Sequence, residues 1–236
     1  MVRILQIETS TEVCSVAISE NGNTVCYKES QEGLNHAELL TVFIEELFTE
    51  NNIEPGILDA VAVSKGPGSY TGLRIGVSVS KGLCYPLNIP LISINSLRVL
   101  GTYAALYYAE FSSMKSNERV LFCPMIDARR MEVYTSLYNL TGEQLKPVSA
   151  EIIDAAFLSE YLEKSTVYFF GNGAKKCEDI ISHPNAHFKG PETTSAQFMS
   201  GIAFDKYNKS QFEDVAYFEP FYLKDFVATV PKNKIF

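Results

Sequence analysis

The chain has 236 residues, of which 46% are hydrophobic and 12% aromatic, and this supply of apolar side chains predicts a folded core and excludes a disordered chain. Its formal net charge of −8 argues against a broad basic surface, and therefore against strong binding of nucleic acid by this chain alone. The five cysteines are widely spaced and include no Cys-x-x-Cys pair, so we expect free thiols in a reducing compartment.

The beginning of the chain does not have the pattern of a secretory leader. Glu8 and Glu12 interrupt the first apolar stretch, and no small-residue cleavage site follows a continuous hydrophobic segment. No segment approaches the ~20 consecutive apolar residues of a membrane-spanning helix. We therefore expect a soluble cytoplasmic protein that makes no membrane contact.

The first elements along the chain are short strands. Residues 3–8 and 13–19 are rich in aliphatic and β-branched side chains, which favour extended structure. The Asn-Gly-Asn turn at residues 21–23 is typical of a hairpin and leads into a third strand near 24–29. These three strands are predicted to form an antiparallel meander.

Strands and helices then alternate. Residues 36–48 carry large apolar side chains at helical spacing, followed by a strand at 59–64, a helix at 71–85 and a strand at 91–94. Such alternation after an antiparallel meander predicts an α/β fold with a mixed sheet flanked by helices.

The loop before the second helix is rich in glycine and hydroxyl residues. Gly66, Gly68 and Gly72 allow backbone torsions and close approaches that a Cβ would prevent, and Ser69 or Thr71 can cap the helix. Backbone N–H groups at such a helix start attract anions. The spacing fits neither the Walker A pattern nor the dinucleotide pattern, and a tight turn without any ligand remains an alternative.

A second cycle of elements begins near residue 119. Residues 6–13 align without gaps with residues 125–132, and in each segment an apolar strand ends in an acid, Glu8 in the first and Asp127 in the second. Short alternating strands also align by chance, so this alignment alone leaves a duplication and a coincidence equally open.

The loop sequence from Gly66 to Gly76, Gly-Pro-Gly-Ser-Tyr-Thr-Gly-Leu-Arg-Ile-Gly, resembles the signature of the bacterial TsaB/YeaZ family of tRNA threonylcarbamoyladenosine biosynthesis proteins. Four further segments resemble the same family in the same order and extend the similarity over nearly the whole chain: residues 4–10, 35–40, 127–134 and 220–224.

This resemblance implies a duplicated, two-lobed fold shared with actin, hexokinase and Hsp70, the ASKHA class of RNase H-like folds, with mixed sheets flanked by helices. We expect an N-terminal lobe at residues 1–105 that contains the glycine loop, and a C-terminal lobe at residues 106–236. A late helix at residues 195–208 is expected to rejoin the first lobe.

Related phosphotransferases place acids at the ends of two such strands, facing the cleft between the lobes, where they hold a magnesium-bound phosphate. Glu8 and Asp127 are the corresponding candidates here, although acids at strand ends also commonly cap turns. The other candidates for a nucleotide site are glycines, hydroxyl residues and arginines: Gly66, Gly68, Ser69, Thr71, Arg74, Arg129, Gly171 and Gly173. The chain is expected to need no cofactor, while weak ATP or ADP binding is allowed.

No metal site is expected in this chain. His183 and His187 have the spacing of a helical zinc pair, but Pro184 disrupts that geometry and the segment is predicted to be a surface loop. The catalytic paralogue of the family carries a metal-binding His-x-x-x-His, and its two histidine positions correspond here to Ser96 and Leu100. Neither side chain replaces an imidazole ligand, so the metal is expected on the partner.

The first two predicted helices are candidates for a partner surface. Small residues recur every four positions on the second helix, and the first helix is apolar over more than one narrow face. Packing of both helices on the chain's own sheet explains the same pattern. The resemblance implies that these helices form the homodimer surface and the surface for the catalytic paralogue, through His36, Leu39, Leu40, Phe43, Gly72, Ile75, Gly76, Val79 and Ser80.

By resemblance, the chain is expected to be a noncatalytic subunit that binds and stabilises the TsaD-like paralogue, with a TsaE-like ATPase joining at their junction and tRNA held mainly through the complex. Two alternatives remain. The first is a nucleotide-binding phosphotransferase or ATPase that uses Glu8, Asp127 and the glycine loop. The second is a peptidase with Ser69 as nucleophile, His36 as base and Asp127 as the orienting acid.

Overall fold

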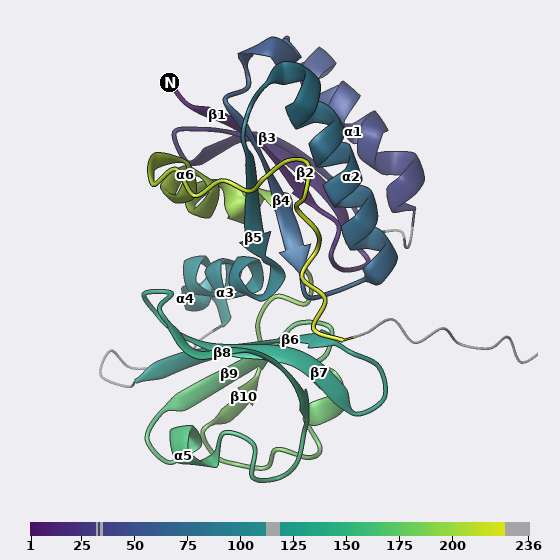
Figure 1. Ribbon diagram of the computed structural model, residues 1–236. Coiled ribbons are helices and arrows are strands. Elements are labelled where there is room, and N and C mark those ends of the chain that lie inside the picture. Colours follow the sequence, from purple (N-terminus) through teal and green to yellow (C-terminus); the bar gives the residue numbers. More distant parts are fainter. Residues whose placement is uncertain (32, 34, 112–118, 225–236) are drawn as a thin grey trace, which may run out of the picture.

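The computed structural model describes residues 1–31, 33, 35–111 and 119–224 of the chain, so residues 112–118 and 225–236 of the expected C-terminal lobe lie outside the described residues. The described elements form two five-stranded sheets, one above the other in Figure 1, each with its own helices or turns. This two-lobed α/β arrangement confirms the fold class expected from the sequence.

The first sheet combines an antiparallel meander with two parallel strands, as the sequence predicts. The meander consists of β1 (Arg3–Glu8), β2 (Cys14–Glu20) and β3 (Asn23–Ser30). The strands β4 (Ala60–Gly66) and β5 (Leu91–Asn95) then add in parallel on the other side of β1. The resulting order is β3-β2-β1-β4-β5, which leaves β1 in the centre.

Helices cover both faces of this sheet because the strands are apolar on both sides. Leu5 and Ile7 of β1 face the helices α1 (His36–Glu50) and α2 (Tyr70–Leu87). Ile4, which directly precedes Leu5 in the strand, faces the opposite side. That side is covered by residues 196–208, which form the short helix η3 (Ala196–Met199) and the helix α6 (Ser200–Asn208), so a late part of the chain returns to the first sheet.

The second sheet repeats the connections of the first. The strands β6 (Val120–Asp127), β7 (Glu132–Asn139) and β8 (Gln144–Ile152) form a second antiparallel meander. The strands β9 (Thr166–Phe170) and β10 (Ala186–Phe188) add in parallel beside β6. The order β8-β7-β6-β9-β10 matches the first sheet strand for strand, which resolves the ambiguous sequence alignment in favour of a duplication.

The second lobe carries shorter helices at the places that correspond to α1 and α2. Only the single turns α5 (Ser159–Leu162) and η2 (Lys175–Cys177) stand there.

The prediction of a surface loop around residue 187 is wrong in part, because His187 lies in β10 and stacks on Tyr168 with ring centroids 5.3 Å apart. A parallel partner strand and an aromatic neighbour override the turn residues that flank this segment. Two further short elements are η1 (Pro55–Ile57) and α4 (Tyr108–Phe111).

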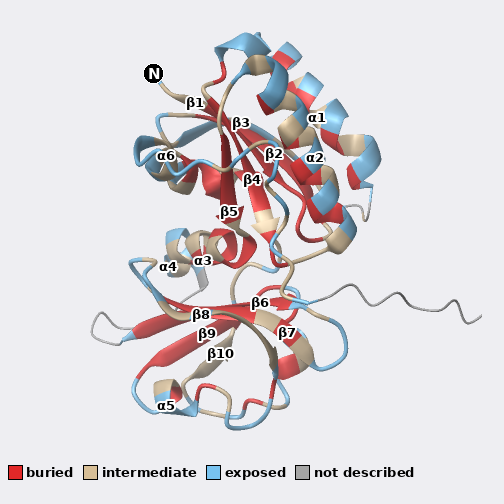
Figure 2. Cartoon of the chain, in the orientation of Figure 1, coloured by how far each residue is buried: buried red, intermediate tan, exposed pale blue. Residues whose placement is uncertain are grey.

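The helix α3 (Ser96–Leu106) lies between the two sheets and packs on both. Val99 belongs to the core of the first lobe, whereas Leu97, Leu100 and Ala104 belong to a core shared with Phe122 and other residues of the second sheet. Figure 2 shows buried residues in the strands of both sheets and in α3 between them. The lobes are therefore joined by a continuous apolar contact.

The glycine loop packs against the turn that follows β1. A Cβ at Gly68 would overlap the carbonyl oxygen of Ser10, and a Cβ at Gly72 would overlap that of Thr9. Hydrogen bonds complete this contact, from the Ser69 N–H to the Ser10 carbonyl oxygen at 2.7 Å and from the Thr9 hydroxyl to the Gly72 carbonyl oxygen at 2.8 Å. Ser69 caps α2, as predicted, by accepting from the Gly72 N–H at 3.3 Å.

This packing predicts opposite effects for alanine at two glycines of α2. Gly72→Ala places a methyl group against the Thr9 backbone and should lower the free energy of unfolding by about 1–3 kcal/mol. Gly82→Ala, in the same helix with no neighbouring atom within 4 Å of the new Cβ, should raise it by about 0.5–1 kcal/mol. Urea unfolding of both variants measures the difference, and equal effects would show that the close approach at Gly72 has no energetic weight.

Candidate functional site

A groove of about 1060 Å³ lies between the two lobes. Four segments form most of its walls: the turn after β1, the loop that begins α2, the hairpin between β6 and β7, and residues 221–224 near the end of the described chain. His36 and Asn172 complete the lining. The carboxyl ends of β1 and β6, the central strands of the two sheets, both approach this region, which is where related folds bind their ligands.

The structure brings only some of the predicted nucleotide residues to this groove. Those that line it come from the glycine loop and the β6–β7 hairpin: Gly68, Ser69, Thr71, Asp127 and Arg129. The others lie outside its lining: Glu8, Gly66, Arg74, Gly171 and Gly173.

Glu8 ends β1 but does not face the groove, contrary to expectation. Its side chain is fully buried, and its Oε1 accepts a hydrogen bond from the Ser10 N–H at 2.7 Å, while Oε2 has no hydrogen-bond partner in the described part of the chain. Burial raises the pKa of Glu8, and the nearby hydroxyls of Ser10, Ser64 and Thr194 only partly oppose that shift. The carboxyl group thus holds the turn that follows β1 and is enclosed away from solvent.

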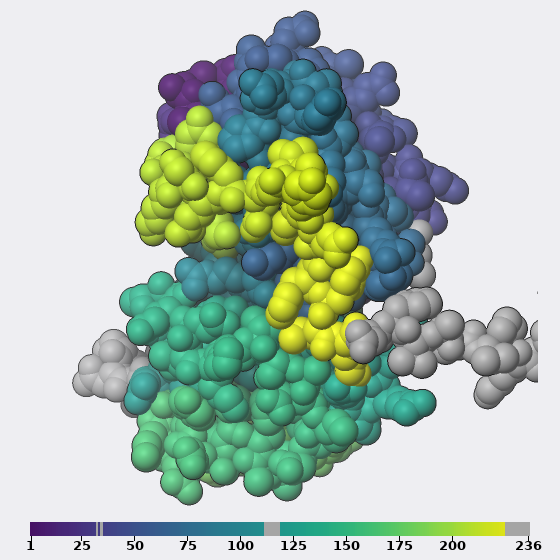
Figure 3. Space-filling model, viewed as in Figure 1, coloured from purple at the N-terminus to yellow at the C-terminus, as the bar shows by residue number. Residues whose placement is uncertain are grey.

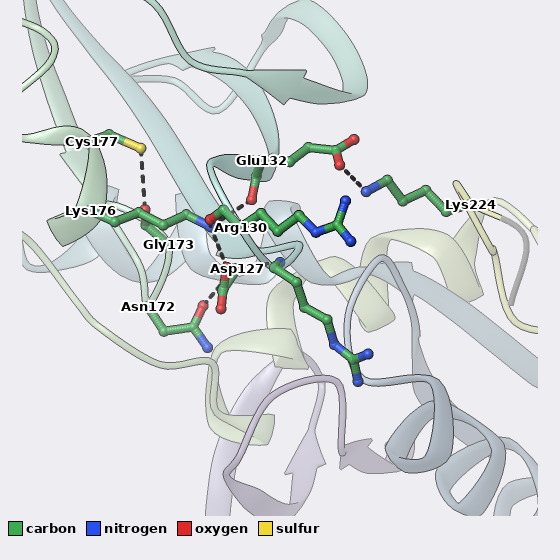
Figure 4. A network of polar contacts seen from close by, with 9 residues as sticks. Asp127, Arg130, Glu132, Asn172, Gly173, Lys176, Cys177 and Lys224 are labelled. Carbon is green, nitrogen blue, oxygen red and sulfur yellow. Dashed lines mark hydrogen bonds and ion pairs between the residues drawn. The ribbon is translucent and has the colours of Figure 1, made fainter. Parts of the chain in front are cut away.

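Asp127, the matching acid at the end of β6, is half-exposed and already engaged. Its Oδ1 accepts from the Arg129 N–H at 3.0 Å and forms an ion pair with Lys176. Lys176 also donates to the backbone carbonyl oxygen of Glu132 at 2.7 Å, and the Asp127 N–H donates to Asn172 at 3.0 Å (Figure 4). These contacts agree with the alternative that the sequence left open, in which this acid caps a turn.

The glycines after β9 fit the chain's own backbone. Gly171 has φ +97°, and a Cβ there would overlap the carbonyl oxygen of Met125 on β6. A Cβ at Gly173 would lie 2.9 Å from the Asp127 nitrogen. In the first lobe, Gly66 at the end of β4 has φ +106°, and a Cβ there would lie 2.9 Å from the carbonyl oxygen of Phe221. The absence of side chains at these positions is therefore explained by internal packing.

Three contacts that the sequence did not predict connect the lobes around the groove. Asn172 donates to the Glu12 carboxylate at 2.9 Å, and Lys224 forms an ion pair with Glu132. Asn172 stands between the candidate residues Gly171 and Gly173, and Lys224 ends the family segment at residues 220–224, but the partners of these two side chains could not be predicted from the sequence. Figure 4 shows Asn172 and Lys224 on either side of the β6–β7 hairpin.

The third contact involves Arg74, which turns to the C-terminal segment and away from the groove. Its guanidinium lies 4.1 Å from the ring centroid of Tyr70, and its Nε donates to the Tyr222 hydroxyl at 3.1 Å. The rings of Tyr70 and Tyr222 are themselves 4.9 Å apart. This arginine holds residues 220–224 against the start of α2.

The side chains of the peptidase alternative do not form a catalytic set. His36 Nε2 donates to the carbonyl oxygen of Thr11 at 2.9 Å, Ser69 caps α2, and Asp127 pairs with Lys176. No hydrogen bond among the described residues joins the serine, the histidine and the aspartate. The geometry required to activate a serine nucleophile is lacking.

The cysteines are also unsuited to nucleophilic chemistry. All five thiols are free, and all but Cys26 are buried. Burial raises the pKa of Cys14 and of Cys84 to about 11, and that of Cys123 to about 12, so these thiols stay protonated.

Within the described ranges, no three His, Cys, Asp or Glu side chains come together as metal ligands. A search of the same residues finds no helix with the length and apolar composition needed to cross a bilayer.

The predicted partner surface divides into buried and accessible residues. The small-residue stripe of α2 faces inward, because Cβ atoms at Gly72 and Gly76 would meet Thr9 and Ser80 is fully buried. His36 and Leu40 are buried as well. The stripe therefore packs on the chain's own turn and sheet, which is the alternative interpretation of that pattern. The partly exposed members of the set are Leu39, Phe43, Ile75 and Val79.

A second groove, of about 630 Å³, runs between α1 and α2 on this outer surface. Val79 and Leu83 of α2 line one side, and Ile44 and Phe48 of α1 line the other. It continues to Ile53 and other residues just after α1, which lie outside the predicted partner surface. The two helices together present a mainly apolar, hollowed surface.

Comparisons with known proteins find similarity to proteins named for tRNA threonylcarbamoyl modification. The model of the family described as TsaD, tRNA N6-adenosine threonylcarbamoyltransferase, matches residues 30–232. The tRNA threonylcarbamoyladenosine biosynthesis protein TsaB of Bacillus subtilis is 30% identical over 75% of this chain and 74% of its own length. The TsaB protein of Escherichia coli is 27% identical over 96% of both chains. Among solved structures, YeaZ from Pseudomonas aeruginosa superposes with a TM-score of 0.78 at 25% identity, covering 94% of this chain and all of that one.

The buried carboxyl group predicts a pH dependence of stability. Since the folded chain holds the pKa of Glu8 above its ordinary value of 4.5, the unfolded chain releases this proton more readily. The stability that Glu8 contributes is therefore fully present below about pH 4.5 and is lost as the pH rises through the raised pKa. Glu8→Gln removes the titration, so its stability relative to the wild type should increase with pH in urea unfolding experiments.

The matched control for that measurement is Glu178→Gln, which removes a negative charge from an exposed position. A stability difference between Glu8→Gln and the wild type that stays constant over the same pH range would contradict the buried, titrating carboxyl group.

Proposed function

The chain belongs to the bacterial TsaB/YeaZ family of tRNA threonylcarbamoyladenosine biosynthesis proteins, and we propose that within this pathway it is a noncatalytic partner subunit. It binds and stabilises a TsaD-like paralogue, which carries the metal and transfers the threonylcarbamoyl group to the adenosine beside the anticodon. A TsaE-like ATPase joins the pair. The tRNA is held mainly through the complex. The modification reaction takes place in the cytoplasm.

The state of the two strand-end acids is the observation that carries this proposal. A phosphotransferase of this fold needs carboxylates that face a metal-bound phosphate. Here Glu8 is enclosed with a raised pKa, and Asp127 is paired with Lys176 and caps a turn. The glycines that would approach a phosphate approach the chain's own carbonyl groups. Both halves of a nucleotide site are thus used for internal structure.

The residues at the paralogue's metal-ligand positions support the same proposal. Ser96 and Leu100 are fully buried at the start of α3. The Ser96 and Ser64 hydroxyl oxygens are 2.8 Å apart, and Leu100 belongs to the core shared by α3 and the second sheet. These side chains join the helix to both lobes and offer no imidazole to a metal.

The outer surface of α1 and α2 suits the proposed partner. Leu39 and Phe43 on α1, with Ile75 and Val79 on α2, are apolar and partly exposed. Val79 also lines the groove between the helices, and Ile75 lines the interlobe groove. Apolar surface around a concave centre is typical of a protein interface. We propose that the paralogue covers this surface in the heterodimer and that a second copy of the chain covers it in isolation, so that the two assemblies compete.

A substitution on this surface separates partner binding from folding. Ile75→Glu should weaken both the homodimer and the heterodimer by about tenfold or more, because it buries an unpaired charge in either interface. The control is Ile152→Glu on β8 of the second lobe, where the isoleucine is 76% exposed. Sedimentation and calorimetric titration with the paralogue measure both associations, and equal effects of the two substitutions would exclude this surface.

The accessory role itself is tested by incorporation of labelled threonine into unmodified tRNA. The reaction contains the adenylate-forming enzyme, the paralogue and the ATPase, with or without this chain. Incorporation should depend on this chain, and this chain without its paralogue should support none. Undiminished incorporation in its absence would reject the accessory role and favour an independent nucleotide enzyme.

A further inference from the structure

We propose that a second cavity at the joint of the lobes binds a small organic phosphate. This cavity, called the basic pocket below, has a volume of about 600 Å³ and is lined by residues of β4, β5, α3, the β7–β8 hairpin, α6 and its following turn, and Phe221. Phe221 also lines the groove described above, so the C-terminal segment separates the two cavities. Figure 3 shows this segment, in yellow, crossing from the first lobe to the second.

The lining of the basic pocket carries an excess of positive charge. Four basic side chains meet at the basic pocket: Lys65 of β4, Arg98 of α3, Lys206 of α6 and Lys209 just after it. Asp205 is the single acid among its lining residues. The whole chain carries a net charge of −8, so this concentration of positive charge runs against its composition. A concave site lined by one sign of charge focuses its field on a ligand of opposite sign.

The internal contacts of these basic groups leave much of that charge unpaired. Lys206 is half-buried and donates to the Ser93 carbonyl oxygen at 2.8 Å. Its pKa is lowered by burial and by the positive charge of Lys65, whereas Glu213, which accepts from the Ser93 hydroxyl, acts in the opposite direction. Two like charges held near each other in a partly buried place are destabilising unless an anion joins them.

Two of the lysines have their ammonium groups available. Across the described residues, neither the Lys65 nor the Lys209 side chain has a hydrogen bond or an ion pair. Arg98, by contrast, donates to the Gly142 carbonyl oxygen and lies 5.7 Å from the ring centroid of Tyr138, which fixes its position. A positioned guanidinium with adjacent free ammonium groups is suited to an anion with several acceptor oxygens.

The remaining walls indicate that the anion has an organic part. Ile94, Tyr138, Val148 and Ile202 contribute apolar surface, and Phe221 leaves 40% of its area exposed. The volume lies in the range of pockets for small molecules, about 300–1,000 Å³. A phosphate group carries about two negative charges at neutral pH and matches several basic groups at once. The negative charge of the rest of the chain disfavours a long polyanion such as RNA.

The inference goes beyond the proposed partner role and is independent of it. The probe for its test is ADP, which joins phosphates to a flat aromatic base, titrated calorimetrically into the full chain without magnesium. ADP should bind, and Lys65→Gln combined with Lys209→Gln should weaken binding by about tenfold or more, because charge-assisted hydrogen bonds are lost. Since neither lysine has an internal partner among the described residues and Lys65 repels Lys206, the melting temperature should not fall.

Two further double variants locate the site. Lys164→Gln with Lys189→Gln removes the same charge from exposed positions of the second lobe and should leave ADP binding unchanged. Arg129→Gln with Arg130→Gln removes it from the interlobe groove. Loss of ADP binding in the groove variant but not in the Lys65 and Lys209 variant would overturn the inference, as would the absence of ADP binding to the wild type. Weakened binding of tRNA but not of ADP in the Lys65 and Lys209 variant would overturn it as well.

Discussion

The burial of α3 between the two sheets is the contact on which the rest of the structure depends. A helix with apolar side chains on several faces gains stability only when each face is covered, and here Val99 meets the first lobe while Leu97 and Leu100 meet the second. The lobes thereby share one apolar junction. The interlobe groove and the basic pocket both lie beside this junction, so their shapes are set by how α3 packs.

The strands and helices of the first lobe, and the repeated order of the second, follow from patterns that the sequence displays directly. Alternating and helical periodicities report which residues face the core, and the shared acid at Glu8 and Asp127 marks equivalent strand ends. The engagement of those acids was not predictable, because it depends on residues far away in the chain. Lys176 neutralises Asp127, and the segment around Thr194 closes over the turn after β1 that holds Glu8.

The small residues of α2 show the same limit of prediction from sequence. Gly72, Gly76 and Ser80 form a stripe that permits close approach, but periodicity does not say what approaches. In the fold, it is the turn after β1, where Thr9 meets both Gly72 and Gly76. The loop therefore keeps the glycines typical of a phosphate site while its closest neighbours are carbonyl oxygens of the same chain. On the outer side of the same helices, partly exposed apolar residues and a groove remain.

The return of residues 196–208 to the first sheet has a consequence for the order in which the protein forms. Ala196, Met199 and Ala203 complete the face of the sheet that contains Ile4 and Ile92, so that core lacks its cover until the ribosome has made most of the chain. The five strands of the first sheet, residues 3–95, and then those of the second sheet, residues 120–188, are all made before these covering residues. During synthesis the first lobe therefore has its strands early, yet it is the last of the two lobes to be finished.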